Sequence, residues 1–219
     1  MSVLQEIIRL DKGFFKVLNG QWTNSFFDTV FPYLRNANLW IPLYLFLFIF
    51  VAINYGRNGW WWILIGIVTV ASSDSISSLV IKEWIFRIRP CHDEEMIGHV
   101  RFLVNYCPQS SSFMSSHAAN HFAMAMFIFT TLKNHVSKWV WIIFLWALFI
   151  AYAQVYVGVH YPLDVICGGL FGTAIGFGWA KFFNRNFQLK IQKDWNFKSF
   201  LLKINGTKKS RYHRSWVYW

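Results

Sequence analysis

Residues 158–164 (GVHYPLD) lie between two long apolar runs and place a histidine and a carboxylate four positions apart. Pro162 suits the first position of a helix, because its missing N–H is not needed there. Asp164 would then lie in the first helical turn, within reach of His160. A carboxylate that holds one nitrogen of an imidazole leaves the other nitrogen free to act. A histidine that merely caps a helix is the alternative, but ionisable groups at the mouth of a membrane span point to function.

Three cations, Lys82, Arg87 and Arg89, precede Pro90, which disfavours helix at Arg89 and marks the end of a helical segment. If the segment is helical, Lys82 and Arg89 are seven positions apart and share a face, whereas Arg87 points nearly opposite. Snorkelling of the long side chains to the membrane interface would also explain them. Two cations on one face, beside the polar stripe 72–78, favour an anion site.

A third group, Ser115-Ser116-His117, opens the apolar run 115–133. Ser115 is a good N-cap, and the N–H groups that follow it form a ready site for a phosphate. An ordinary helix cap is the alternative. His117 and His121 are also four positions apart, as in a zinc pair. The cysteine or glutamate ligands that usually accompany such a pair are missing.

The composition is that of an integral membrane protein. Of 219 residues, 55% are hydrophobic, 21% are aromatic and only 14% are charged. The net charge of +11 does not indicate nucleic-acid binding, because much of it lies in the tail after the last apolar run. The first 20 residues lack the apolar core and cleavage site of a secretory signal peptide.

The elements that must position these residues are all helical, and we expect an all-α membrane bundle of five to six spans. Residues 3–19 form an amphipathic helix that we expect to lie on the membrane surface. The apolar segment 22–35 is short enough to be a half-span. The predicted spans are 38–55, 60–81, 115–133, 138–157 and 162–183. The chain divides into interfacial helices (1–35), a membrane core (36–183) and a basic tail (184–219).

The charge rule orients this bundle. Arg57, Lys133 and Lys138 share a side with the basic tail, which makes that side cytoplasmic. The loop 90–114 and His160 then share the opposite face. A disulfide between Cys91 and Cys107 is predicted if that loop faces an oxidising compartment.

Together, these motifs resemble the type 2 phosphatidic acid phosphatase family, which is related to the vanadium haloperoxidases. The string SSHAANH at 115–121 and the Pro90-Cys91 loop look like its Bacteroidetes-type members. The resemblance covers most of the chain and implies a phosphatase/haloperoxidase-like core. The matching residues, in order, are Lys82, Arg89-Pro90, Ser115-Ser116-His117, His160 and Asp164. Two departures stand out. Met114 and Ser116 replace a proline and a glycine of the second motif, and Ala153 and Gln154 replace a serine and an arginine of the third.

The resemblance implies a role for each residue. His160 would attack phosphorus to form a phosphohistidine, and Asp164 would orient it. His117 would protonate the leaving oxygen and then help to activate water. The phosphoryl oxygens would be held by Lys82, Arg89, the Ser115 hydroxyl and the Ser116 N–H. No metal and no cofactor is expected.

Gln154 can donate a hydrogen bond to phosphate but brings no charge. Our hypothesis is that Arg101, in the loop 90–114, supplies the missing charge to the phosphate. The alternative is that Arg101 is a solvated loop charge that attracts anionic head groups.

The expected substrate is a lipid phosphate that enters laterally from the bilayer. Lipid A phosphates and undecaprenyl pyrophosphate lead the candidates, before phosphatidylglycerol phosphate and phosphatidate. We expect the bacterial inner membrane, with the site facing the periplasm, no nucleic acid and no obligate protein partner. One alternative is a degenerate member that binds lipid phosphates without turnover. Another is a metal-dependent hydrolase that uses His117, His121, His160 and Asp164.

Overall fold

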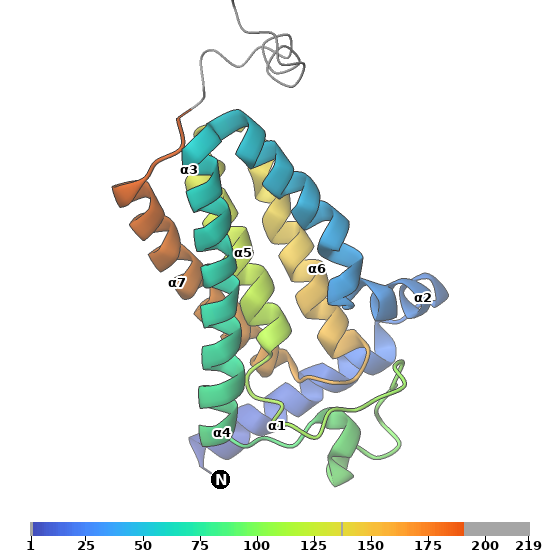
Figure 1. Ribbon diagram of the computed structural model, residues 1–219. Helices are drawn as coiled ribbons and strands as arrows, with labels where there is room; N and C mark the ends of the chain where they lie inside the picture. Colours follow the sequence, from blue (N-terminus) through green and yellow to red (C-terminus); the bar gives the residue numbers. More distant parts are fainter. Residues whose placement is uncertain (1, 137, 191–219) are drawn as a thin grey trace, which may run out of the picture.

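A computed structural model describes residues 2–136 and 138–190, and every regular element within them is helical. The predicted all-α class is therefore confirmed. The bundle is built from α3 (Ile41–Ser75), α5 (Ser116–Leu132), α6 (Ile142–Tyr156) and α7 (Pro162–Asn186). Figure 1 shows these helices running along one long axis, with α1 lying across one end.

The long helix α3 folds back on itself at Gly56, where φ is 54° and ψ is −132°. A positive φ of this kind favours glycine. Gly59 then lies against the other arm, because a Cβ at this position would meet the backbone oxygen of Val51. Residues 41–55 and 57–75 are therefore two arms of a hairpin, which matches the two successive predicted spans. The second arm continues through a π-helical turn (Ile76–Ile81) into the short α4 (Lys82–Trp84).

Three helical segments of the described chain are long and apolar enough to cross a membrane: Ala37–Trp84, Trp139–Tyr156 and Pro162–Asn186. The first of them contains the turn at Gly56. The 17-residue α5 is shorter than these segments, and many of its residues are buried among the other helices. The predicted count of five to six spans is not confirmed by these segments.

Helices α5 and α7 pack closely along their length because α7 presents glycines to α5. A Cβ at Gly172 or Gly176 would meet the backbone oxygen of Ala119 or Ala123. Small residues allow helix backbones in membranes to approach in this way. The first turns of the two helices consequently meet, and the Ser115 N–H donates to the Asp164 carbonyl at 3.0 Å. This contact brings the second and third motifs together.

The N-terminal helix α1 (Val3–Lys16) confirms the helix predicted at 3–19, and a π-helical turn (Val17–Gln21) follows it. It lies beneath the start of α7 (Figure 1), where Phe15 is buried and contacts Tyr161 with ring centroids 5.3 Å apart. Asp11 of the same helix is also buried. The next helix, α2 (Ser25–Leu34), ends at Arg35.

The loop between α4 and α5 contains two 3-10 turns (Pro90–His92 and Glu94–Met96), and further 3-10 turns precede α3 (Ala37–Trp40) and α6 (Lys138–Trp141). Cys91 and Cys107 form a disulfide in that loop, as predicted. The basic tail predicted from residue 184 lies mostly outside the described residues.

Candidate active site

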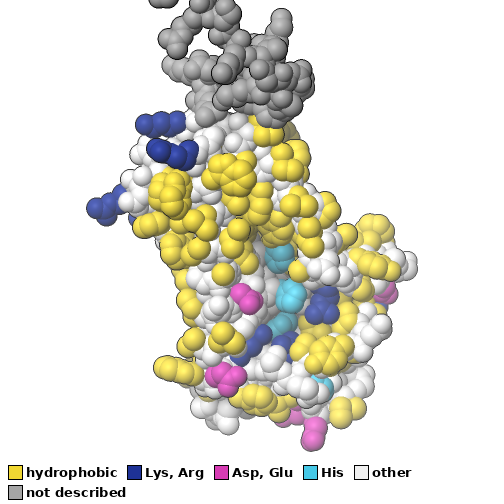
Figure 2. Space-filling model, in the orientation of Figure 1, with side chains coloured by type: hydrophobic (Ala, Val, Ile, Leu, Met, Phe, Trp, Pro, Cys, Tyr) yellow, Lys and Arg dark blue, Asp and Glu magenta, His cyan; other side chains and the backbone are white. Residues whose placement is uncertain are grey.

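A cavity of about 800 Å³ lies between the two arms of α3, the first half of α5 and the segments that precede α3, α5 and α7. Figure 2 shows it as a hollow in which histidine side chains lie between basic groups, with apolar side chains above them. Its polar lining includes Lys82, Arg89, Ser116, His117 and His160. Three sequence motifs that lie far apart along the chain therefore meet around one space.

His160 lies in the short connection between α6 and α7 and is only 3% exposed. Its Nδ1 is 3.4 Å from the Ser112 hydroxyl and 3.7 Å from Oδ2 of Asp164. The Ser112 hydroxyl is 2.5 Å from the same Oδ2. Because a carboxylate can only accept, Ser112 donates to Asp164 and can accept from the ring N–H of His160. This arrangement puts the ring hydrogen on Nδ1 and leaves Nε2 with the lone pair.

Asp164 is completely buried and every contact on it is a donor. Arg87 Nη1 binds Oδ1 at 2.6 Å, and the Tyr161 N–H donates to Oδ2 at 2.9 Å. The other Nη of Arg87 binds Asp11 of α1 at 2.6 Å. A carboxylate held by this many donors keeps its charge and its orientation.

The expectation that Arg87 points away from the site was wrong. It assumed a helix that continues to Arg89, but the chain leaves the helix at Ile85, where φ is −120° and ψ is 95°. In the extended segment that follows, Arg87 turns toward Asp164 and Arg89 toward His160. Lys82 stays on the helix and lines the cavity.

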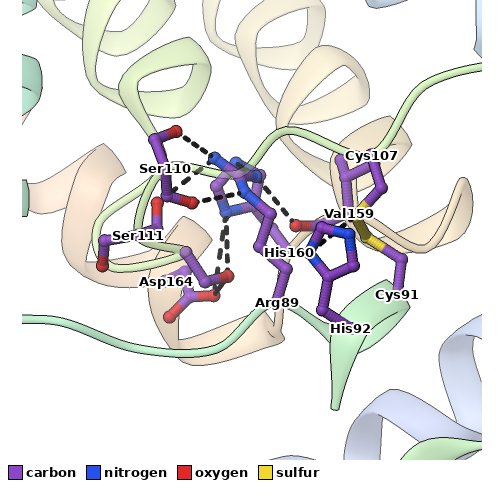
Figure 3. Close-up of a disulfide and its surroundings, with 10 residues drawn as sticks. Arg89, Cys91, His92, Cys107, Ser110, Ser111, Val159, His160 and Asp164 are labelled. Atoms are coloured by element: carbon purple, nitrogen blue, oxygen red, sulfur yellow. Dashed lines mark hydrogen bonds and ion pairs between the residues drawn. A yellow bond between two sulfur atoms is a disulfide. The ribbon is translucent and has the colours of Figure 1, made fainter.

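Arg89 is buried between the loop before α5 and the connection before α7 (Figure 3). Its Nε donates to the Ser110 carbonyl at 2.9 Å, and its Nη1 donates to the Val159 carbonyl at 3.0 Å. The same Nη1 is 3.1 Å from Nε2 of His160. The guanidinium thus lies directly beside Nε2 of His160 and places a positive charge at this edge of the ring.

The disulfide fixes both segments that hold Arg89. Cys91 follows Arg89 by two residues, and Cys107 precedes Ser110 by three. Figure 3 shows the sulfur–sulfur bond beside these residues, on the far side of Arg89 from Asp164. Joining the two segments limits the positions that the guanidinium can take.

The start of α5 brings Ser116 and His117 to the cavity, but not Ser115. Ser115 is completely buried, and its hydroxyl caps the helix by accepting the Ala118 N–H at 3.4 Å. The Ser116 hydroxyl is 2.9 Å from that of Ser78. The N–H groups of Ser116 and His117 lie in the first turn, where a helix offers no internal acceptor. They remain donors for an anion.

Gln154 and Arg101 do not line the cavity. Gln154 is completely buried, and its side-chain amide has no hydrogen-bond partner among the described residues. Its backbone carbonyl accepts the N–H groups of Val159 and His160, both at 3.2 Å, and so fixes the connection between α6 and α7. Arg101 binds both carboxylate oxygens of Asp28 in α2, at 2.7 and 2.8 Å. The hypothesis that Arg101 supplies charge to a phosphate in the cavity is therefore not supported, because its guanidinium is held elsewhere.

The geometry does not favour a metal centre built on the histidines. Within residues 2–136 and 138–190, one set of three ligand atoms lies mutually within 4.8 Å: Cys91, His92 and Cys107. Two members of that set are already joined in the disulfide. His117, His121, His160 and Asp164 do not form such a set.

Burial lowers the pKa values of two groups of the site, His160 and Arg89. Desolvation lowers the pKa of His160 to about 4, against the opposing effect of Asp164. The ring is therefore neutral near pH 7, which is the form that can attack phosphorus. Desolvation likewise lowers the pKa of Arg89 to about 10, and the guanidinium remains charged at that pH.

The sequence did not reveal three residues of the site: Ser112, Asp11 and Arg35. Ser112 lies in a serine-rich loop with no motif. Asp11 and Arg35 belong to the N-terminal helices, whose position relative to the core had no signal in the sequence. Arg35 is a lining residue of the cavity.

Residues 59–188 match the PAP2 superfamily. The chain is 28% identical over 164 residues to a lipid A 4'-phosphatase of Bacteroides thetaiotaomicron, covering 73% of this chain and 70% of the relative. It is 24% identical over 176 residues to a lipid A 4'-phosphatase of Porphyromonas gingivalis, covering 79% of this chain and 72% of the relative.

Two solved structures resemble this chain in fold. The LpxE structure of Aquifex aeolicus superposes with a TM-score of 0.59 at 28% identity, covering 78% of this chain and 95% of that one. A transmembrane PAP2-type phosphatidylglycerolphosphate phosphatase of Bacillus subtilis shares the fold, with a TM-score of 0.56 at 22% identity, covering 87% of this chain and 90% of that one. The family match spans more than half of the chain and includes all three motifs. The chain therefore belongs to the PAP2 superfamily and is a multi-pass membrane phosphatase.

Proposed function

We propose that this enzyme hydrolyses a phosphate of a lipid head group through a phosphohistidine, and that the preferred substrate is of the lipid A type. The observation that carries the proposal is the cavity itself. Its cationic, histidine-lined end continues into a wall of apolar side chains: Tyr44, Phe48, Ile67, Val70, Ala71 and Met124. A lipid could lay its acyl chains along that wall while its phosphate reaches His160.

The contacts of His160 and His117 support the following proposed steps. Nε2 of His160 attacks phosphorus, and the bond from phosphorus to the leaving oxygen breaks. His117 delivers a proton to that oxygen and then takes one from the water that hydrolyses the phosphohistidine. The pair of Ser112 and Asp164 stabilises the positive charge that appears on the His160 ring.

Lys82, Arg89 and the first-turn N–H groups of α5 stabilise the negative charge on the phosphoryl oxygens. Donors that are already in place when charge develops supply the largest share of most rate enhancements. The retained set of His160, Asp164 and His117 favours turnover over a degenerate protein that only binds lipid phosphates.

The lipid A-type substrate is supported by the names of the two Bacteroidetes relatives. An undecaprenyl-diphosphatase of Sulfolobus acidocaldarius is 40% identical over 77 residues, but that match covers only 35% of each chain. Undecaprenyl diphosphate is therefore the second candidate. We further propose that the enzyme lies in the bacterial inner membrane with the cavity facing the periplasm.

A lipid panel tests the proposal. The purified protein in detergent, with and without a strong chelator, is given lipid A, undecaprenyl diphosphate, phosphatidylglycerol phosphate and phosphatidate, and phosphate release is measured. We expect the fastest release from lipid A and no effect of the chelator. His160→Ala should abolish release and the acid-labile phosphoprotein formed from labelled substrate, whereas His99→Ala, in the exposed loop, should retain both. Full activity of His160→Ala would disprove the mechanism, and loss of activity on chelation with recovery on zinc would favour a metal enzyme.

A further inference from the structure

Arg35 is a cation of the cavity that no motif accounts for. It follows the last residue of α2, and its side chain lines the cavity together with Lys82, Arg89, His117 and His160. Its Nε is buried and has no hydrogen-bond partner within the described part of the chain. A buried guanidinium nitrogen without a partner is costly unless something else binds it.

A cation at the end of a helix usually serves the helix dipole or the last carbonyl groups. That explanation does not suffice here, because three of the last four carbonyl groups of α2 already have other donors, and none of these donors is the Arg35 side chain. The N–H groups of Arg35 and Asn36 donate to the carbonyls of Phe31 and Tyr33, at 3.2 and 2.9 Å. The indole of Trp40 donates to the Leu34 carbonyl at 2.8 Å. The side chain of Arg35 is therefore not needed to complete the helix.

The other arginines near this end of the bundle already have ion-pair or hydrogen-bond partners. Arg87 is held by Asp11 and Asp164, and Arg101 by Asp28. Arg89 donates to the backbone carbonyls of Ser110, Ser111 and Val159, and these bonds fix it beside His160. Arg35 is close enough to Arg89 for its charge to add to the desolvation that lowers the Arg89 pKa. Two like charges brought together at one cavity favour an anion between them.

We infer that Arg35 binds a nonbridging oxygen of the reacting phosphoryl group and supplies, from α2, the charge that position 154 lacks. The inference rests on the proposed function for the identity of the anion. Gln154 is buried beneath the connection and does not reach the cavity, so the chain carries no cation where the family resemblance leads us to expect one. Arg35 approaches the same space from another helix, with a planar fork that suits two phosphoryl oxygens.

The test compares Arg35→Gln and Arg35→Lys with the parent and with Arg57→Gln. Arg57 is exposed at the opposite end of the bundle and provides the matched loss of one positive charge. Each protein is assayed with its best lipid phosphate and with para-nitrophenyl phosphate, which carries one phosphate and no acyl chain. Binding of inorganic phosphate is measured separately by calorimetry, and the melting temperature is recorded.

We expect Arg35→Gln to lower kcat/KM by roughly 10²–10³-fold with both substrates and to weaken the binding of inorganic phosphate. Arg35→Lys should recover only part of this loss, since an ammonium cannot form the fork. Arg57→Gln should behave as the parent. The melting temperature of Arg35→Gln should be unchanged or higher, because an unpaired charge is removed.

Three results would overturn the inference. Activity of Arg35→Gln within about threefold of the parent would mean that Arg35 does not bind the phosphate. A loss confined to the lipid substrate would assign Arg35 to another part of the head group. A clear fall in melting temperature would assign it a structural role. If the parent hydrolyses none of the substrates, the proposed function fails, but the calorimetric comparison of phosphate binding still decides the role of Arg35.

Discussion

At the scale of single residues, the site is organised around the difference between the two ring nitrogens of His160. Nδ1 lies beside the Ser112 hydroxyl, which can accept its hydrogen and in turn donates to Asp164. Nε2 lies beside Arg89, which cannot accept a proton and attracts an anion. The ring is thus polarised from one side and presented to phosphorus from the other. A histidine that only capped α7 would not need a buried arginine at its second nitrogen.

The burial of His160 predicts how the folded state responds to acid. In an unfolded chain a histidine titrates near pH 6.5, whereas burial lowers the pKa of His160 to about 4. Between these values the unfolded chain binds a proton that the folded one does not, so stability is fully present above about pH 6.5 and is lost as the pH falls toward 4. We expect the melting temperature of the parent to fall across this window, and part of that fall to be absent in His160→Gln.

The matched control for this titration is His99→Gln, in the exposed loop, which should follow the parent. Melting curves taken at constant ionic strength between pH 4 and pH 8 make the comparison. Parallel curves for the parent and His160→Gln would mean that folding does not shift the His160 pKa, and burial would then not be what keeps the ring neutral.

Residues within a motif could be predicted because their geometry is local. His160 and Asp164 are one helical turn apart, and His117 follows a recognisable cap. Asp11 and Arg35 could not be predicted, because their contacts depend on how distant elements pack. The Asp11 carboxylate accepts the N–H of Leu163 across 152 positions of sequence, at 2.8 Å. No periodicity in the sequence of α1 carries that information.

At the scale of elements, the approach of α5 to α7 sets the distance between the proposed acid and the nucleophile. His117 lies in the first turn of α5, and Asp164 lies in the first turn of α7. The glycines of α7 keep these first turns together. The helices themselves followed from apolar runs in the sequence. Their pairing did not, since several apolar helices of similar length could have been neighbours.

Gly172→Ala tests this pairing. A Cβ at this position would meet the backbone oxygen of Ala119, and backbone cannot move aside as a side chain can. We expect a destabilisation of about 1–3 kcal/mol from overpacking, accompanied by a loss of phosphatase activity as the two first turns separate. Thermal unfolding in detergent and phosphate release measure the two effects.

Gly178→Ala is the control on the same helix, because a Cβ there would meet nothing within 4 Å. It should be neutral or slightly stabilising, since alanine favours helix by up to about 1 kcal/mol over glycine. Equal stability of both variants would show that the close contact does not depend on glycine at position 172.

At the scale of the whole molecule, the loops at the two ends of the bundle differ in charge. Asn58, at the turn of α3, donates to the Phe187 carbonyl at 2.9 Å, so this turn lies beside the end of α7. Exposed basic residues gather at this end: Arg57, Lys133, Arg185 and Lys190. The opposite end holds the cavity and the acidic loop with Asp93, Glu94 and Glu95 (Figure 2). Positive charge at the ends of spans marks the cytoplasmic side, and a disulfide persists on the oxidising side.

Cysteine labelling in intact cells tests this orientation. In a Cys167→Ser background, which removes the free cysteine of the described chain, Asn134→Cys marks the basic end and Glu94→Cys the cavity end. Both positions are exposed. A thiol reagent small enough to enter the periplasm, but unable to cross the inner membrane, should label Glu94→Cys at once. It should label Asn134→Cys only after the inner membrane is permeabilised.

The charge distribution and the disulfide predict the same orientation independently, because the first depends on membrane insertion and the second on the redox state of the compartment. Labelling of Asn134→Cys in intact cells, with protection of Glu94→Cys, would place the cavity in the cytoplasm and require a cytoplasmic lipid phosphate as the substrate.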